Sequence, residues 1–464
     1  MLSTSDALNH SIYEFGPFQV QSSERQLLRN GIKVPVTAKT FDTLLFLLQR
    51  RGRLVEKSEI MEAIWPDSFV EEGNLSVTIH MIRRALGDDG EHKYIETISK
   101  RGYRFAESAR EIVKSSPEWS GVPRTHGLPL TRLPQDSKVQ PAQWPSNDSK
   151  AYQFYLKGRY FWNKRTENGL RRSIECFQQA TIEDPQYAVA YAGLADSYAL
   201  LGSYGVEPAQ QAYPSAKSAA LKALQLDASL SETYTSLGMI SFFYEWNWPQ
   251  AEREFRCAID LNPKYPLART WYAVYLAAVG RNSEAIDEVQ RAQELDPVSL
   301  IINTEVGRIF YLTHKHDQAV VAYRGVIDLD PHFARAHTRL GMAYAAERNF
   351  GEAINEFQQA KQISGHDPYL DGLLGFAYAL SGSTAKARKV LKELMQRLHR
   401  EYVPAFSMAL VYIGLGDRDQ AMELLAKSSS DRSTYMVFAK ADPLLDSVRL
   451  DPRFSSLLDR MGLQ

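Results

Sequence analysis

Two neighbouring stretches carry side chains that suit recognition of a polyanion. In residues 72–86, the helix face opposite an apolar stripe would present Gly73, Val77, His80, Met81 and Arg84, and that face holds no acid. Residues 94–105 read as a hairpin whose tip is basic at Arg101. Donors of these types bind base edges and phosphate oxygens, so the pattern favours duplex nucleic acid as the ligand.

Other chemistry has little support in the sequence. It contains no GxxxxGK phosphate loop, no HExxH, no GxSxG and no cysteine-rich metal spacing, so we predict neither an enzyme nor a cofactor. His314 and His316 lie two residues apart in a predicted turn, where a solvated pair is a better interpretation than a metal site. The aromatic run from Tyr160 to Trp162 could line a ligand box, but packing between helices explains it more simply.

The first stretch must be a helix to position these groups. Leu75, Ile79, Ile82 and Leu86 are spaced by four, three and four residues, which is typical of one buried helix face. In the second stretch, apolar and polar residues alternate on both sides of a turn at residues 99–102, as in a hairpin. The alternative is a surface helix beside a solvated strand edge, but the agreement of helix, hairpin and spacing favours a DNA-binding unit.

The preceding residues predict a small sheet and two helices. Residues 12–36 contain short apolar runs broken at Gly16-Pro17 and Asn30-Gly31, which indicates antiparallel strands with a tight turn at the second break. Thr40 is a predicted cap for a helix over 41–50, and Ser58 for one that ends before Pro66.

The runs FVEEGNLSVTIHMIRRAL (69–86) and YIETISKRGYRF (94–105) together resemble a known family. It is the winged-helix DNA-binding domain of the OmpR/PhoB type, in particular its CadC-like branch, and the resemblance extends over roughly residues 11 to 107. It implies that the helix over 72–86 enters the major groove and that the hairpin is the wing. In this family the loop at 66–71 can touch RNA polymerase, and a plain connector is the other interpretation.

The resemblance also implies DNA contacts. The contacts to bases and phosphates would come from Asn74, Val77, Thr78, His80, Met81 and Arg83, and those of the wing from Thr97 and Ser99. We add four neighbours to this predicted site: Arg84, Lys100, Arg101 and Tyr103. Gly73, Met81 and Ser99 stand where relatives often carry a basic residue, so the DNA sequence recognised does not follow from the resemblance.

The remaining chain reads as a linker and a repeat array. Residues 111–148 contain six of the 21 prolines, and a coil of this length spans roughly 35 Å. From residue 149 a 34-residue period brings prolines to 263, 297 and 331, with a small residue twelve positions before each. An aromatic or aliphatic residue follows that small residue four positions later. The pattern resembles tetratricopeptide repeats, with about eight units over 149–430 and capping helices over 431–464.

In tetratricopeptide proteins, five positions on the first helix of each unit line a concave groove. Carried onto this sequence, they are Thr235, Met239, Phe242, Thr270, Thr304, Arg308, Tyr311, Arg335, Thr338 and Met342. Methionine and aromatic side chains beside two arginines suit a peptide that bears an acidic group, and the open alternative is that these residues are merely solvated.

Composition sets further bounds. The chain has 464 residues, 44% of them hydrophobic and 23% charged, with a net charge of -1. Residues 1–110 hold 15 basic and 15 acidic side chains, so DNA affinity must come from charge placement. We expect no signal peptide, no membrane span and two free thiols, Cys176 and Cys257, and therefore a cytoplasmic protein.

The sequence therefore predicts a multidomain, mostly α protein, in which an N-terminal α+β winged helix precedes an all-α solenoid. Its predicted function is that of a one-component transcriptional regulator that binds double-stranded DNA and senses or recruits a protein or peptide through the repeats. RNA polymerase and a second copy of the chain are further candidate partners. The alternative is a non-enzymatic scaffold or adaptor whose winged helix mediates protein contacts.

Overall fold

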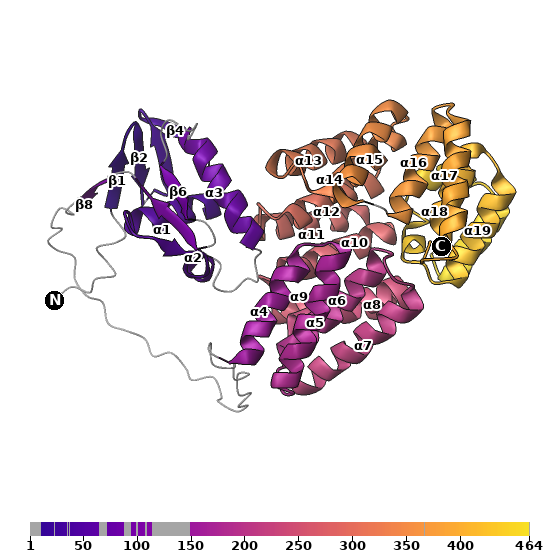
Figure 1. Ribbon diagram of the computed structural model, residues 1–464, viewed down its shortest axis with the longest axis horizontal. Coiled ribbons are helices and arrows are strands. Elements are labelled where there is room, and N and C mark those ends of the chain that lie inside the picture. Colours follow the sequence, from indigo (N-terminus) through magenta and orange to yellow (C-terminus); the bar gives the residue numbers. More distant parts are fainter. Residues whose placement is uncertain are drawn as a thin grey trace, which may run out of the picture. The chain divides into compact units, whose positions relative to one another are not determined.

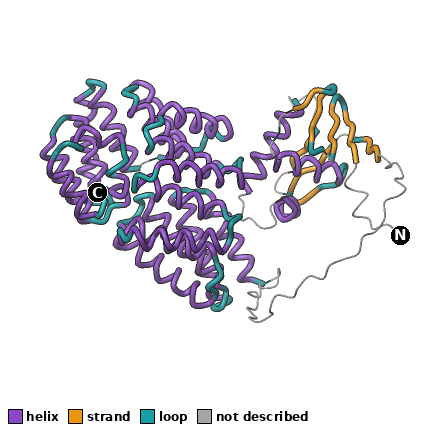
Figure 2. Tube along the Cα trace, turned by 180° about the vertical axis from the view of Figure 1, so that it is seen from behind, coloured by secondary structure: helices purple, strands orange, loops and turns teal. Residues whose placement is uncertain are grey.

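The computed structural model separates the chain into two compact units, residues 1–144 and 145–464 (Figure 1). It describes residues 11–22, 24–34, 36, 38–64, 72–87, 94–98, 101–106, 109–113, 149–365 and 367–463. The predicted loop at 66–71, the wing-tip residues Ser99 and Lys100, and residues 114–148 of the predicted linker lie outside the described residues. Within the described part of the chain, all strands belong to the first unit (Figure 2).

The first unit begins with a five-stranded antiparallel sheet. Its strands are β1 (Ser11–Phe15), β2 (Phe18–Gln21), β3 (Gln26–Arg29), β4 (Ile32–Val34) and β8 (Arg110–Val113), in the order β4-β3-β2-β1-β8. Asn30 and Gly31 both have positive φ, 50° and 80°, as the predicted tight turn between β3 and β4 requires. β8 pairs with β1 and therefore continues three residues into the predicted linker, because β1 offers an open edge.

Three helices and a smaller sheet complete this unit. They are α1 (Ala38–Gln49), α2 (Lys57–Ile64) and α3 (Glu72–Leu86), with β5 (Val55–Glu56), β6 (Ile95–Ile98) and β7 (Gly102–Phe105) in the order β5-β7-β6. The predicted stripe of α3 is buried in the core. Thr40 is not a cap as predicted, because α1 begins two residues earlier and Thr40 is buried inside it.

The second unit is a stack of helix pairs. Its sixteen successive helices in the described part of the chain are α4 (Lys150–Asn163), α5 (Glu167–Glu183), α6 (Ala188–Ser203), α7 (Ala209–Leu226), α8 (Ser231–Ile240), α9 (Trp248–Leu261), α10 (Pro266–Ala278), α11 (Asn282–Leu295), α12 (Leu300–Leu312), α13 (His316–Leu329), α14 (Ala334–Ala346), α15 (Phe350–Ser364), α16 (Pro368–Leu380), α17 (Thr384–Arg397), α18 (Ala405–Leu415) and α19 (Arg418–Ser430). One π-helical turn, η2 (Ser241–Glu245), extends α8. The predicted fold class, a small α+β domain followed by an all-α solenoid, is confirmed.

Small residues let the two helices of a repeat approach closely. A Cβ added at Gly341 would lie 2.5 Å from the Phe357 ring, and one at Gly307 would lie 2.5 Å from the Tyr323 ring. These aromatic rings are fully buried, and each fills the space that a side chain at the glycine would otherwise occupy.

The chain ends in a segment that does not continue the repeats. We call residues 431–463 the C-terminal segment; it contains the 3-10 helices η3 (Thr434–Phe438) and η4 (Pro443–Val448) and then α20 (Pro452–Met461). α20 packs on α19, as a cap would, but η3 packs against η2 and α6, and η4 packs against α14 and α18. The segment therefore reaches first helices of repeats that are far apart in the sequence.

Candidate nucleic-acid interface and repeat groove

The exposed side of α3 is a stripe at every fourth residue. Ser76, His80 and Arg84 are exposed, and no acidic residue occurs between Leu75 and Gly87. The core-facing stripe on the opposite side holds the helix against α1 and α2. Asn74 and Val77 are also predicted contacts, but their side chains lie outside the described residues. The described stripe offers imidazole, guanidinium and hydroxyl donors in one line, which is a chemistry suited to base edges and phosphates.

Arg83 connects this helix to the hairpin. Its Nη2 donates hydrogen bonds of 2.8 Å to the Ile95 carbonyl oxygen and to Thr97 Oγ1. The predicted role of Arg83 as a base or phosphate contact remains untested, but the structure gives its guanidinium a positioning role. It fixes the angle between α3 and β6, from which the exposed Thr97 projects.

Two predicted DNA contacts are wrong. Thr78 is 0% exposed and Tyr103 is 5% exposed, so neither side chain can reach a duplex in this structure. Thr78 belongs to a buried helix face that is wider than the predicted stripe. Tyr103 occupies the inner side of the hairpin, where its hydroxyl oxygen lies 3.4 Å from Ser76 Oγ. Met81 is half-buried, with its sulfur 3.9 Å from Thr40 Oγ1, and thus contributes little outward surface.

The hairpin adds positive charge beside α3. Arg101 is exposed at the turn, whereas Arg104 forms an ion pair of 2.8 Å with Glu96 across the hairpin. Gly102 is required here for a steric reason, because a Cβ at this position would lie 2.0 Å from the Val55 carbonyl oxygen on β5. The exposed members of this candidate interface in the described residues are thus Ser76, His80, Arg84, Thr97 and Arg101.

The predicted repeat groove is formed by the first helices of four repeats, but it is not open. Its ten residues lie on α8, η2, α10, α12 and α14, and eight of them are buried: Thr235, Met239, Phe242, Thr270, Thr304, Arg308, Tyr311 and Met342. Arg335 and Thr338 are half-buried. The expectation that both arginines face solvent is therefore wrong for Arg308, and Arg335 faces solvent only in part.

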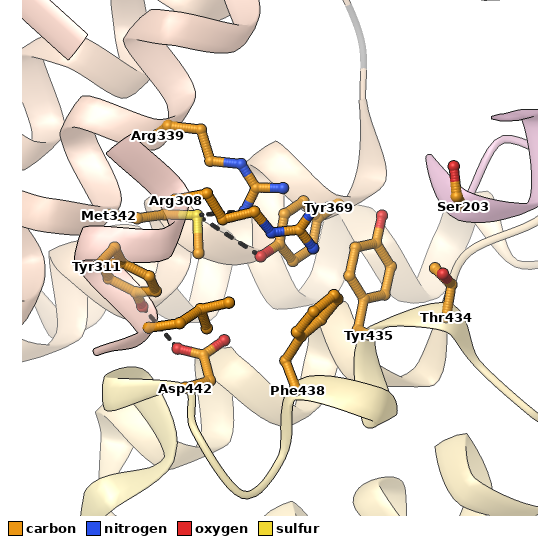
Figure 3. A pocket seen from close by; sticks show the side chains of 11 residues that line it. Ser203, Arg308, Tyr311, Arg339, Met342, Tyr369, Thr434, Tyr435, Phe438 and Asp442 are labelled. Carbon is orange, nitrogen blue, oxygen red and sulfur yellow. Dashed lines mark hydrogen bonds between the residues drawn. The ribbon is translucent and has the colours of Figure 1, made fainter. Parts of the chain in front are cut away.

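The C-terminal segment is the main cover of this groove. Phe438 packs edge-on to Phe242 with 6.0 Å between ring centroids, and the Arg308 guanidinium lies 4.1 Å from the centroid of the Phe438 ring. The Tyr311 hydroxyl donates a hydrogen bond of 2.6 Å to Asp442 Oδ1 (Figure 3). Another repeat covers the half-buried arginine, because Arg335 stacks on Tyr204, after α6, at 3.5 Å.

Charges in the covered groove are balanced by close partners. Arg308 Nη1 donates to Glu305 Oε2 at 3.1 Å, and both side chains are buried. Burial alone would raise the pKa of Glu305, but the charges of Arg308, Arg339 and Arg335 lower it. Burial raises the pKa of the Asp442 carboxyl, against the hydrogen bond from Tyr311. A cavity of about 20 Å³ remains between these groups, which is room for a single water molecule.

The described residues contain neither a cluster of metal ligands nor a helix that could span a membrane. No three His, Cys, Asp or Glu side chains gather as metal ligands would in the described ranges, and the rings of His314 and His316 are 5.7 Å apart. Trp162 is buried with the Arg165 guanidinium 3.5 Å from its ring centroid, whereas Tyr160 is exposed, so the aromatic run does not form one box. No helix in the described part of the chain is long and apolar enough to cross a bilayer.

Comparison with known proteins finds a family match within each unit. Residues 31–105 match a family described as "Transcriptional regulatory protein, C terminal", and residues 240–299 and 307–368 match the tetratricopeptide repeat family. Each match covers less than half of the chain.

Curated relatives each match a part of this chain. The transcriptional regulator HilA of Salmonella typhi is 35% identical over 121 residues, which are 26% of this chain and 21% of HilA. The transcriptional activator CadC of Escherichia coli (strain K12) is 26% identical over 165 residues, which are 32% of this chain and 31% of CadC. The chain thus spans only about a fifth to a third of these relatives. Among solved structures, the Cut9–Hcn1 hetero-tetramer of the APC/C is 16% identical with a TM-score of 0.47, over 68% of this chain and 56% of that chain.

Proposed function

We propose that this chain, in which an OmpR/PhoB-type domain precedes tetratricopeptide repeats, is a one-component transcriptional regulator that binds duplex DNA and receives a protein partner through its repeats. The observation that carries the proposal is the acid-free, exposed stripe of Ser76, His80 and Arg84 beside the exposed Arg101. A duplex presents phosphates on both sides of its major groove. A helix in that groove can contact base edges while a basic hairpin beside it contacts a neighbouring phosphate backbone.

The roles of the exposed residues differ. Arg84 and Arg101 are suited to phosphate contacts, which provide affinity for any sequence. His80 lies at the middle of the stripe and is suited to a base edge, where it would provide preference for one sequence over another. Arg83 acts indirectly in this scheme, since it holds the hairpin at the angle that lets both groups engage one duplex.

The repeats supply the second half of the proposed function. Residues 240–299 and 307–368 match the tetratricopeptide repeat family, and we assign to the repeats the binding of a protein or peptide. Contact with RNA polymerase through residues 66–71 and association of two copies are further proposals of the same scheme.

The test is selection of bound fragments from a pool of random duplex DNA by the purified full chain. We expect recovery of fragments that share a motif. The variant Arg84→Ala with Arg101→Ala should lose most of this recovery, whereas Arg53→Ala, which removes an exposed arginine that is paired with Glu59, should retain it. Equal recovery by both variants, or none by the wild type at low salt, would favour the scaffold or adaptor alternative.

A further inference from the structure

Three side chains of the C-terminal segment, Tyr435, Phe438 and Asp442, contact residues of the repeat groove. Tyr435 stacks on Tyr369 with ring centroids 4.1 Å apart, and Phe438 lies between Phe242 and the Arg308 guanidinium. Asp442 accepts the hydrogen bond of Tyr311 (Figure 3). These anchors are spaced by three and four residues, so an aromatic ring, a second aromatic ring and a carboxylate enter the groove in that order.

Hydrogen bonds to distant parts of the chain fix both ends of the segment. Gln210 Nε2 donates to the Asp431 carbonyl oxygen at 2.8 Å, and Trp248 Nε1 donates to the Met461 carbonyl oxygen at 2.8 Å. The Tyr435 hydroxyl donates to the Tyr204 carbonyl oxygen at 3.1 Å. Each bond joins residues more than 200 positions apart in the sequence, so the segment lies across the array in the way that a bound peptide would.

The charge of the groove matches this occupant. Three arginines, Arg308, Arg335 and Arg339, act on the groove, and the repeats themselves supply two carboxylates among them, Glu305 and Asp367. Asp442 is the third carboxylate, and it comes from the segment. Without the segment, the groove would lose one carboxylate from among its arginines and would expose aromatic rings, which is a surface suited to a peptide that presents a carboxylate beside aromatic side chains.

The segment differs from the repeats that it covers in its secondary structure. η3 and η4 are 3-10 helices of five and six residues, a conformation with poorer hydrogen-bond geometry than the α-helix. Leu450, two residues after the end of η4, is 95% exposed. The apolar side chains of the segment, among them Met436, Val437 and Leu445, are buried in the core of the repeats. Because the 3-10 turns hold the backbone less strongly than an α-helix does, we expect the segment to open at a lower free energy than the repeats.

From these observations we infer that the C-terminal segment is an intramolecular ligand of the repeat groove. The external partner would then be a protein segment that presents two aromatic side chains and a carboxylate with the spacing of Tyr435, Phe438 and Asp442, and it displaces the chain's own copy. This inference deepens the proposed function, since it rests on the repeats as the receiver of a protein partner. The tethered segment competes at an effective concentration on the order of 1 mM, so only a partner that binds well or is locally abundant displaces it.

The test uses a fluorescent synthetic peptide with the sequence of residues 431–450 and the full-length chain. Fluorescence anisotropy would compare the wild type with a Phe438→Ala, Asp442→Asn variant, whose own segment has lost two anchors. We expect the variant to bind the peptide at least about tenfold more tightly, because its groove is vacated more often. Tyr311→Phe in the variant background should weaken peptide binding about tenfold, since the hydroxyl that binds Asp442 is lost. The matched control is Leu450→Ser, which changes the same segment outside the groove and should behave as the wild type.

A second measurement avoids destabilising substitutions. A protease site inserted between Arg432 and Ser433 would cut the segment from the repeats after folding, and excess labelled peptide should then replace the cut segment. The inference is overturned if the cut segment stays bound and labelled peptide never enters, or if the folded variant binds peptide no better than the wild type. Duplex DNA binding by the same samples separates the two proposals, because retained DNA binding without peptide exchange refutes only the groove inference. Peptide exchange without DNA binding refutes only the regulator function.

Discussion

Adjacent arginines on α3 illustrate two different roles in one short stretch. Arg83 bonds to Ile95 and Thr97 of the hairpin, whereas Arg84 is exposed. We expect Arg83→Ala to lower the free energy of unfolding of the N-terminal unit by about 1–2 kcal/mol, because a charged donor with two acceptors is lost. Arg84→Ala should change stability by less than about 0.5 kcal/mol and weaken binding to all DNA sequences. Urea unfolding and a DNA titration of both variants would check this, and equal stability loss in both would contradict the assignment.

His80 is the residue on which sequence preference should depend. His80 is exposed at the centre of the α3 stripe, between Ser76 and Arg84. We expect His80→Ala to change the motif recovered from random duplexes while general affinity falls by less than that caused by Arg101→Ala. A substitution that lowers affinity without altering the motif would show that His80 contacts phosphate rather than a base.

The sequence predicts the buried side of α3 better than it predicts which of the remaining side chains are exposed. Leu75, Ile79 and the other stripe residues were predictable because helical spacing alone sets which side is apolar. The burial of Thr78 and Tyr103 was not, because spacing does not reveal how far a neighbouring helix or strand wraps around that side. The bond from Arg83 to Thr97 joins two elements whose mutual angle no local pattern contains.

The contact between the two helices of a repeat is filled by different pairs of side chains in different repeats. Gly341 faces the large ring of Phe357. Two repeats earlier, 68 residues back in the sequence, the corresponding positions hold Ala273 and Val289. A larger residue on the first helix thus accompanies a smaller one on the second. The sequence period predicts this arrangement because the same helix crossing recurs in every repeat.

This size exchange gives a prediction for the repeat domain. Gly341→Leu should destabilise the solenoid by about 1–3 kcal/mol or more, because the added side chain meets the Phe357 ring with no space to occupy. Gly341→Ala should be milder, and adding Phe357→Val should recover part of its loss by copying the Ala273 and Val289 pair. Thermal unfolding followed by circular dichroism would measure this. If the combined variant loses more stability than the two single variants lose together, the proposed exchange is wrong.

The C-terminal segment is the element that sequence reasoning missed. Capping helices were expected after Asp431 because a stack of helix pairs needs an end, and α20 does pack on α19. The placement of η3 and η4 in the groove had no periodic signal, since 3-10 turns of five or six residues are too short to show one. The available hint was compositional, because Tyr435 and Phe438 are large rings in a tail that a simple cap would not need to bury.

For the molecule as a whole, one winged helix is a small DNA-binding surface. Such a module buries about 600–1,000 Å² on DNA, which limits its affinity at physiological salt. If the repeats associate, two tethered modules would gain a factor on the order of 10² to 10⁴ without any new contact to DNA. We therefore expect the full chain to prefer two half-sites about one helical turn apart, in direct repeat. Footprinting on one and on two half-sites would measure this preference, and equal affinity for both duplexes would remove self-association from DNA binding.

The central claim is that the N-terminal unit binds duplex DNA through phosphate contacts around the α3 stripe. Its most direct test is the affinity of the full chain for a selected duplex, measured across a range of salt concentrations. Neutralisation of four to six phosphates by groups such as Arg84 and Arg101 predicts a slope of about -4 to -5 in a plot of log affinity against log salt, and the slope should become less steep by about 1 with Arg101→Ala. No binding at low salt, or a slope near zero, would contradict this account of the protein.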